Sequence, residues 1–328
     1  MRRFFLIVGI ALFTLGAFTL GCTKQPEKIS HHPANEQDYL TIATGTVSGP
    51  YFTIGEALAK VYKTKLGYNT AVRSTDGSVE NVSLLENHKA DLAFVMSDTA
   101  AFELDRYVKS RDARSKQPPF KAVAGLYFNY VQIVTLQDEN IQSVYDLKGK
   151  RVGVGAPNSG VERNARMILQ EHSISYQDIQ PEYLSYAEAM EQLKNKKIDA
   201  AFVTSGLPNN AVLELQKLKD VAIVPIQANI IDHLLKQYPF FEKAELPAGV
   251  YQNNQPIPTV AIRNILLVRS DLTDAQVYKM TKTFFENLNT VQQAHQAANN
   301  INRDGAGKGL VVPLHSGAIK YFKDSGIQ

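Results

Sequence analysis

The hydrophobic and polar positions of this chain follow a repeated order of strand, polar loop and helix. Residues 39–43 alternate as a half-buried strand does, residues 44–55 are rich in glycine and hydroxyl side chains, and residues 56–62 have helical spacing. Further strands are predicted at 69–74 and 90–96, each followed by a polar turn and a helix. A loop that starts a helix faces the positive end of the helix dipole, which suits a small polar or anionic group, although an ordinary strand-to-helix turn has the same pattern.

The second half of the chain repeats this construction. A strand at 151–155 leads through a Gly/Ser loop into a helix at 161–169. A strand at 197–203 ends in a polar loop at 204–210, and its sequence is similar to that of the earlier strand at 90–96. We therefore expect two halves of similar construction.

Three further apolar runs indicate how the halves are connected. Runs at 122–129 and 131–136 predict two strands at the first crossing, and a run at 259–269 predicts a strand that returns the chain to the first half. In open α/β sheets, ligands bind beyond the carboxyl ends of the strands, so the polar loops of both halves should face one cleft. Hinge motion is expected near Asn129 and Ile265.

The N-terminus is typical of an exported protein. Arg2 and Arg3 precede an apolar run at 4–20, which predicts a signal peptide over residues 1–21, although a retained membrane span has a similar length. Cys22 follows at once, in a context that resembles a bacterial lipobox, so we expect it to be lipidated. Residues 22–38 would then be the lipidated cysteine and a flexible tether.

Composition and motifs argue against several classes of function. The chain has 328 residues and a formal charge of +3, and two of the positive charges lie in the expected signal peptide, so nucleic-acid binding has little support. One cysteine and scattered histidines give neither a disulfide nor a metal-ligand spacing, and no cofactor is predicted. Nucleophile-elbow, zinc-protease, dinucleotide and P-loop motifs are missing from the sequence, so no catalytic residue is predicted. His315 is expected to cap the final helix rather than to act as a base.

The chain resembles the solute receptors of TRAP transporters of the TAXI type. The resemblance lies in blocks that follow one another in order: 44–55, 77–81, 90–98, 125–127, 155–162, 199–202, 206–208, 246–251 and 313–318. It implies a type II periplasmic-binding-protein fold, with two lobes joined by a hinge and the ligand cleft between them. Lobe one would comprise 39–127 plus 269–328, and lobe two would comprise 128–268.

The same resemblance implies the function and its partners. The receptor would capture a small organic anion or amino acid, such as glutamate, glutamine or a dicarboxylate. It would act as a monomer on the periplasmic or cell-surface side of the membrane and deliver the solute to an ion-gradient-driven permease. Phe52 and Asn129 depart from the residues that are frequent in the family, which leaves the identity of the ligand open.

Candidate ligand-binding residues come from the polar loops of both halves. Backbone and hydroxyl groups of the first loop would bind one end of the ligand, Tyr51 would form an aromatic wall, and Asp98 is a candidate for a ligand ammonium. Ser97 and Asp98 are equally well explained as helix caps. The full set is Thr44, Thr46, Ser48, Gly49, Tyr51, Ser97 and Asp98 from lobe one, and Asn158, Ser159, Gly160, Thr204 and Ser205 from lobe two.

Three other functional classes are compatible with parts of this pattern. The binding protein of an ATP-driven transporter for sulfonates or vitamin precursors would share the fold. A ligand-sensing receptor would share it as well. An exported enzyme is the least supported, because the sequence offers no nucleophile, acid or base in a recognisable arrangement.

Overall fold

A computed structural model describes residues 39–110 and 118–327. The predicted signal peptide, the predicted lipidation site Cys22 and the predicted tether lie outside the described residues. None of the described helices is both long and apolar enough to cross a membrane.

Within the described residues, ten strands form one mixed sheet. The order of its main path is β2-β1-β3-β10-β4-β7-β5-β6, while β8 pairs with β4 and β9 pairs with β10. The strands are β1 Tyr39–Ala43, β2 Asn69–Arg73, β3 Leu92–Met96, β4 Phe120–Leu136, β5 Arg151–Gly153, β6 Gln180–Glu182, β7 Ala200–Ser205, β8 Val221–Val224, β9 Phe241–Leu246 and β10 Ile257–Arg269. The α-helices are α1 Pro50–Leu66, α2 Ser78–Glu86, α3 Ser97–Lys109, α4 Gly160–Glu171, α5 Tyr186–Lys194, α6 Asn210–Gln216, α7 Ala228–Gln237, α8 Asp274–Glu286, α9 Leu288–Gln292 and α10 Ser316–Asp324.

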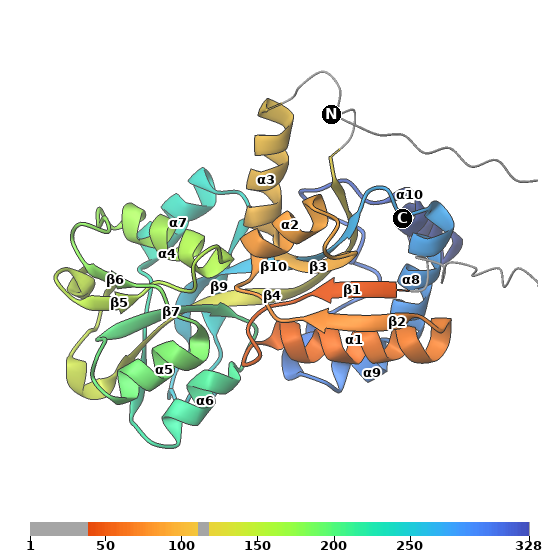
Figure 1. Cartoon of the computed structure of the whole chain (residues 1–328). Coiled ribbons are helices and arrows are strands. Elements are labelled where there is room, and N and C mark those ends of the chain that lie inside the picture. The colour runs from red at the N-terminus through yellow and green to blue at the C-terminus, as the bar shows by residue number, and fades with distance from the viewer. Residues whose placement is uncertain (1–38, 111–117, 328) are drawn as a thin grey trace, which may run out of the picture. The chain divides into compact units, whose positions relative to one another are not determined.

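Helices cover both faces of the sheet in each lobe (Figure 1). Lobe one consists of β1–β3 with α1–α3 and α8–α10, and lobe two consists of β5–β9 with α4–α7. In lobe one, α1, α8, α9 and α10 pack their apolar side chains on one face, and α2 packs on the other. In lobe two, α4 and α7 share one core, and α5 and α6 share another. In the core of lobe one, the large side chain of Phe284 is almost completely buried and contributes about 1.5–3 kcal/mol of hydrophobic stabilisation.

Two long strands, β4 and β10, pass from one lobe to the other. β4 pairs with β10 from Phe120 to Tyr130 and then with β7 from Tyr130 to Thr135. β10 pairs with β9 up to Ile262 and with β3 from Asn264 onward. The change of partner therefore lies beside the expected hinge residues, Asn129 and Ile265. The exact lobe boundaries stay a prediction.

A network of amides holds these two strands together at the crossing. The side-chain amide of Asn264 donates to the carbonyl oxygen of Tyr127 at 3.0 Å and to the Oδ1 atom of Asn129 at 2.9 Å. The Oδ1 atom of Asn264 accepts a short hydrogen bond from the hydroxyl of Tyr51. The start of α1 is thus tied to both crossing strands.

Several predicted elements differ from those observed. The two strands predicted at 122–129 and 131–136 are one continuous strand, β4, because it keeps a partner on either side of Asn129 and Tyr130. The Pro- and Asn-rich stretch after residue 240 contains β9, which the prediction missed. Thr204 and Ser205 end strand β7 and do not form a loop. The remaining predicted strands and helices are confirmed to within a few residues.

Candidate functional site

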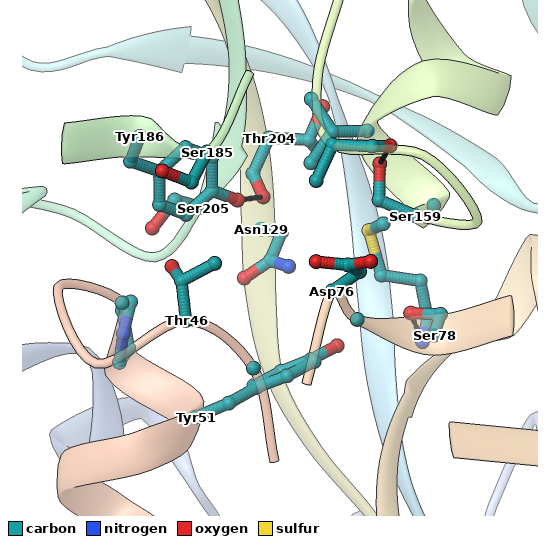
Figure 2. Close-up of a pocket in the computed structure, with 18 of the residues that line it drawn as sticks. Thr46, Tyr51, Asp76, Ser78, Asn129, Ser159, Ser185, Tyr186, Thr204 and Ser205 are labelled. Carbon is teal, nitrogen blue, oxygen red and sulfur yellow. Dashed lines mark hydrogen bonds between the residues drawn. The ribbon is translucent and has the colours of Figure 1, made fainter. Parts of the chain in front are cut away.

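A cavity lies between the two lobes, at the ends of strands and the starts of helices. Its volume is about 50 Å³, and Figure 2 shows the polar side chains that converge on it. The lining residues are Gly45, Thr46, Gly49, Pro50, Tyr51, Asp76, Gly77, Ser78, Met96, Tyr127 and Asn129 from lobe one and the crossing strand, and Ala156, Ser159, Gly160, Val161, Leu184, Ser185, Tyr186, Thr204 and Ser205 from lobe two. Both lobes therefore contribute to one site.

The loop after β1 forms the wall on the side of lobe one. The backbone N–H of Gly49 donates to the carbonyl oxygen of Thr46 at 2.9 Å, which closes a tight turn before α1. Pro50 occupies the first turn of that helix, where the N–H that it lacks would have no helical partner. Tyr51 then packs against Phe94, with ring centroids 5.3 Å apart, and burial raises the pKa of its phenol well above the usual value. Tyr51 is therefore a neutral, fixed part of the wall.

In the wall on the side of lobe two, hydrogen bonds of a helix-capping serine and of one tyrosine fix the backbone. Ser159 caps α4, since its hydroxyl accepts from the N–H of Glu162 at 3.1 Å and donates to the carbonyl oxygen of Ala156 at 2.7 Å. Tyr186 donates to the carbonyl oxygen of Thr204 at 2.7 Å. These bonds fix the loop before α4, and they join the start of α5 to the end of β7.

Five of the described helices start at this cavity. Their N-cap residues all line it: Gly49 of α1, Gly77 of α2, Met96 of α3, Ser159 of α4 and Ser185 of α5. The first N–H groups of a helix have no partner within it, and the helix dipole makes this end partly positive. The cavity can therefore bind carboxylate or other polar oxygen atoms without a basic side chain.

The described residues of the lining include a single charged one. Asp76 is that residue, and no lysine, arginine or histidine of residues 39–110 and 118–327 lines the cavity. Partial burial raises the pKa of the Asp76 carboxyl, and the nearby carboxylates of Glu80 and Glu188 raise it further. Arg73 lies outside the lining, and its guanidinium is 3.8 Å from Glu80. The side-chain charge at the cavity is therefore negative.

Two buried hydroxyl groups in the lining have no hydrogen-bond partner. They are the Oγ1 atom of Thr204 and the phenolic oxygen of Tyr127, on side chains that are almost completely buried. Buried hydroxyls are normally hydrogen-bonded, because an unpaired one costs free energy. Both groups are thus available to a ligand.

The lobes also contact each other directly beside the cavity. The guanidinium of Arg163 in α4 binds the carboxylate of Glu103 in α3. The side-chain amide of Asn164 donates to Asp98 Oδ2 at 2.7 Å. Burial raises the pKa of Asp98 to about 6, although the hydrogen bonds to Thr99 and Asn164 and the charge of Arg163 oppose the rise. Since these partners come from opposite lobes, the described conformation is a closed one.

A glycine and a backbone hydrogen bond complete the closed interface. A Cβ atom at Gly160 would lie 2.1 Å from the Cε atom of Met96, so a side chain there would press on the opposite lobe. The N–H of Glu80, in the first turn of α2, donates to the carbonyl oxygen of Asn158 at 3.2 Å. Close approach of the lobes therefore depends on small residues and on backbone groups.

The structure brings seven of the predicted ligand-binding residues together and places five elsewhere. The seven that line the cavity are Thr46, Gly49, Tyr51, Ser159, Gly160, Thr204 and Ser205. Their contacts with a ligand stay predictions.

The other five predicted residues lie outside the lining. The hydroxyl of Thr44 donates to the carbonyl oxygen of Arg73 and so joins β1 to β2. Ser48 lies in a separate surface hollow beside α5 and α6. Ser97 and Asp98 are buried at the start of α3, and Asn158 is an exposed loop residue with a φ of 55°.

Sequence reasoning missed several polar lining residues. Asp76 and Ser78 were assigned to a plain turn, although they follow a strand and precede a helix as the predicted site loops do. Ser185 and Glu188 form a capping box, whose Ser-x-x-Glu spacing is visible in the sequence. Tyr127 and Asn129 were expected in a strand and a hinge, and only the fold shows that they also face the cavity.

The structure clarifies two other candidate groups. In residues 39–110 and 118–327, no three His, Cys, Asp or Glu side chains are arranged to hold a metal ion. His315 caps α10 as predicted, because its Nδ1 atom accepts from the N–H of Gly317 at 3.2 Å.

Comparison with known proteins identifies the family and supports the fold. The sequence matches the NMT1-like family over residues 42–326. Outer membrane lipoprotein 1 of Mannheimia haemolytica is 24% identical over 308 residues, which are 92% of this chain and 98% of that protein.

Two solved structures resemble the fold at low sequence identity. The binding protein component of an ABC phosphonate transporter from Pseudomonas aeruginosa has 13% identity and a TM-score of 0.51, over 79% of this chain and 78% of that one. A putative L-cystine ABC transporter protein from Listeria monocytogenes has 14% identity and a TM-score of 0.51, over 81% of this chain and 98% of that one. The chain therefore belongs to the NMT1-like family, and its two-lobed α/β fold is that of periplasmic solute-binding proteins.

Proposed function

We propose that this protein is an extracytoplasmic receptor whose lobes close on a small organic solute and deliver it to a membrane permease. The cavity between the lobes carries this proposal. Five helix N-termini and two unpartnered hydroxyls of the described residues meet there, in the contact zone of two lobes that are joined by two strands. Binding at such an interface favours the closed form, because the ligand contacts both walls only when the lobes are together.

The transporter partner that we propose is a TRAP permease of the TAXI type, driven by an ion gradient. The ordered sequence blocks support this, and they also favour glutamate, glutamine or a dicarboxylate as the solute. An ATP-driven transporter is the second candidate, because the similar solved structures are named as components of ABC transporters. Uptake into membrane vesicles that contain a candidate permease and the purified receptor distinguishes the two. A TRAP permease works without ATP when an ion gradient is present, whereas an ABC transporter requires ATP.

The proposed attachment is a lipid on Cys22, which would hold the receptor on the outer side of a membrane. The name of the Mannheimia haemolytica relative, an outer membrane lipoprotein, supports this attachment. The tether at 22–38 would allow the folded part to reach the permease, and we propose that the receptor acts as a monomer.

Native mass spectrometry of the purified protein, followed by calorimetry with the solute it carries, tests the site. Thr204→Val removes a hydroxyl that has no partner in the protein, so thermal stability should hold while the affinity falls by about two- to tenfold. Thr135→Val is the matched control, because its buried hydroxyl donates to the carbonyl oxygen of Asp199 at 2.7 Å. That variant should lose stability and keep its affinity. Equal affinity of Thr204→Val and wild type would exclude this wall of the cavity as the binding site.

A further inference from the structure

The charge of the cavity restricts the ligands that fit it. Asp76 is the only charged residue among the described residues of the lining, and its carboxylate lies between Asn129 and Ser78 (Figure 2). Glu80 and Glu188 add negative charge nearby, and Arg73 is already beside Glu80 at 3.8 Å. A ligand with two carboxylates would meet a third carboxylate and no cationic side chain of the described lining, which is unfavourable because like charges repel.

The wall on the side of lobe two offers hydrogen-bond donors. Thr204 is 1% exposed, and its hydroxyl oxygen has no partner among the described residues. Helices α4 and α5 also begin on this side, so their first N–H groups and dipoles favour a negative group. Tyr127, on the crossing strand β4, adds a second buried hydroxyl without a partner. Among the described lining residues, the wall of lobe two therefore has donors and no carboxylate, whereas the wall of lobe one has Asp76.

Resting on the proposed function, we propose that the ligand is a compact amino acid with no net charge, whose ammonium group binds Asp76 and whose carboxylate binds the donors toward lobe two. The cavity of the closed form is small, about 50 Å³, so it favours a compact ligand. Among the solutes that the sequence resemblance implies, this charge pattern favours the uncharged amino acid over the dicarboxylates.

The test compares ligands that differ in the ammonium group. Thermal-shift assays with the twenty common L-amino acids, lactate, succinate, glutarate and 2-oxoglutarate identify the best ligand, and calorimetry then measures the affinities. An amino acid without net charge should bind best, and the acids without an ammonium should bind at least about tenfold more weakly. Asp76→Asn should lower the affinity for the amino acid by about ten- to a hundredfold, because a charge-assisted hydrogen bond to its ammonium group is lost.

A matched variant separates direct contact between Asp76 and the ligand from the effect of the other negative charges near the cavity. Glu80→Gln removes a nearby negative charge from a residue outside the lining, and its amide oxygen can still accept from the N–H of Asp76. It should change the affinity by less than about threefold. A similar loss in Glu80→Gln and Asp76→Asn would overturn the role of Asp76.

The remaining outcomes are also decisive. The inference is overturned if a dicarboxylate or lactate binds wild type as tightly as any amino acid, or if no amino acid binds. A solute without an ammonium group, found by native mass spectrometry and weakened by Thr204→Val, would overturn the inference and leave the receptor function intact. Absence of any small molecule together with absence of binding would count against the receptor function itself.

Discussion

Protonation of Asp98 should tighten ligand binding, because this carboxyl group lies in the contact between the lobes. Asp98 Oδ2 accepts from Asn164 at 2.7 Å, whereas Asp98 Oδ1 and Asn164 Oδ1 are both buried without a partner. A proton on Asp98 Oδ1 could be donated to Asn164 Oδ1. Two hydrogen bonds would then join the lobes in place of one, and no buried oxygen of this pair would be left unpaired.

The size of the effect follows from the burial of Asp98. Burial in the described closed form raises the pKa of this carboxyl to about 6, and we expect the ordinary value of 3.8 to return when the lobes separate and water reaches the group. A pKa that is higher in the closed form means that closing takes up a proton, so closure is favoured as the pH falls. The gain is absent at pH 8 and reaches about tenfold in affinity at pH 5, which is about 1.4 kcal/mol. The groups that face Asp98 are the guanidinium of Arg163, which is ion-paired with Glu103, and the neutral phenol of Tyr51.

Calorimetry between pH 8 and pH 5 measures this effect. Wild type should bind about tenfold more tightly at the lower pH and take up about half a proton per ligand at pH 6, measured in buffers of different ionisation enthalpy. In Asp98→Asn, the new amide can form both hydrogen bonds with Asn164 at any pH. The affinity of this variant for the ligand should therefore not rise as the pH falls. Asp105→Asn, on the exposed side of the same helix, is the control and should follow wild type.

Two results would refute this reasoning. One is an affinity of wild type that does not rise between pH 8 and pH 5. The other is the same pH profile in Asp98→Asn and wild type, because the titration of the ligand and of Asp76 is common to both proteins and only their difference reports on Asp98.

Three further predictions concern stability and attachment. Gly317→Ala should destabilise the protein by about 1–3 kcal/mol in chemical denaturation, because a Cβ would lie 2.3 Å from the carbonyl oxygen of Asp274; unchanged stability would contradict the packing of α10 on α8. His315→Ala should cost about 1 kcal/mol through loss of the α10 cap, and His315→Asn, which can also cap, should recover most of it. Cys22→Ser should release the protein from membranes into the soluble fraction after cell fractionation, and continued membrane retention would contradict the lipid anchor.

The sequence allowed most of the fold to be predicted, because the pattern of local elements carries it. Strand β3 and helix α3 follow directly from the buried run at 90–96 and the residues after it. The break between the two predicted strands at Asn129 was wrong for a nonlocal reason. The amide of Asn129 is paired with Asn264, which lies 135 positions later in the chain, and such a partner is invisible in a local pattern.

The candidate site was predictable in kind and only partly in detail. The Gly- and hydroxyl-rich loops identified the helix starts at Gly49 and Ser159. Asp98 and Asp76 both lie where a strand leads into a helix. Asp98 nevertheless faces the contact between the lobes, whereas Asp76 faces the cavity. Which carboxylate faces which surface depends on how the lobes meet, and that is decided by contacts such as Gly160 against Met96.

The placement of Asn129 links recognition to mechanics. This side chain lines the cavity, and its Oδ1 atom also accepts the hydrogen bond from Asn264 at the point where β4 and β10 pass between the lobes. Any solute that engages the Asn129 amide would therefore contact the predicted hinge between the lobes. Ligand binding would then change the stiffness of the predicted hinge as well as the angle between the lobes. A permease would distinguish the ligand-bound receptor by the larger free energy needed to open it.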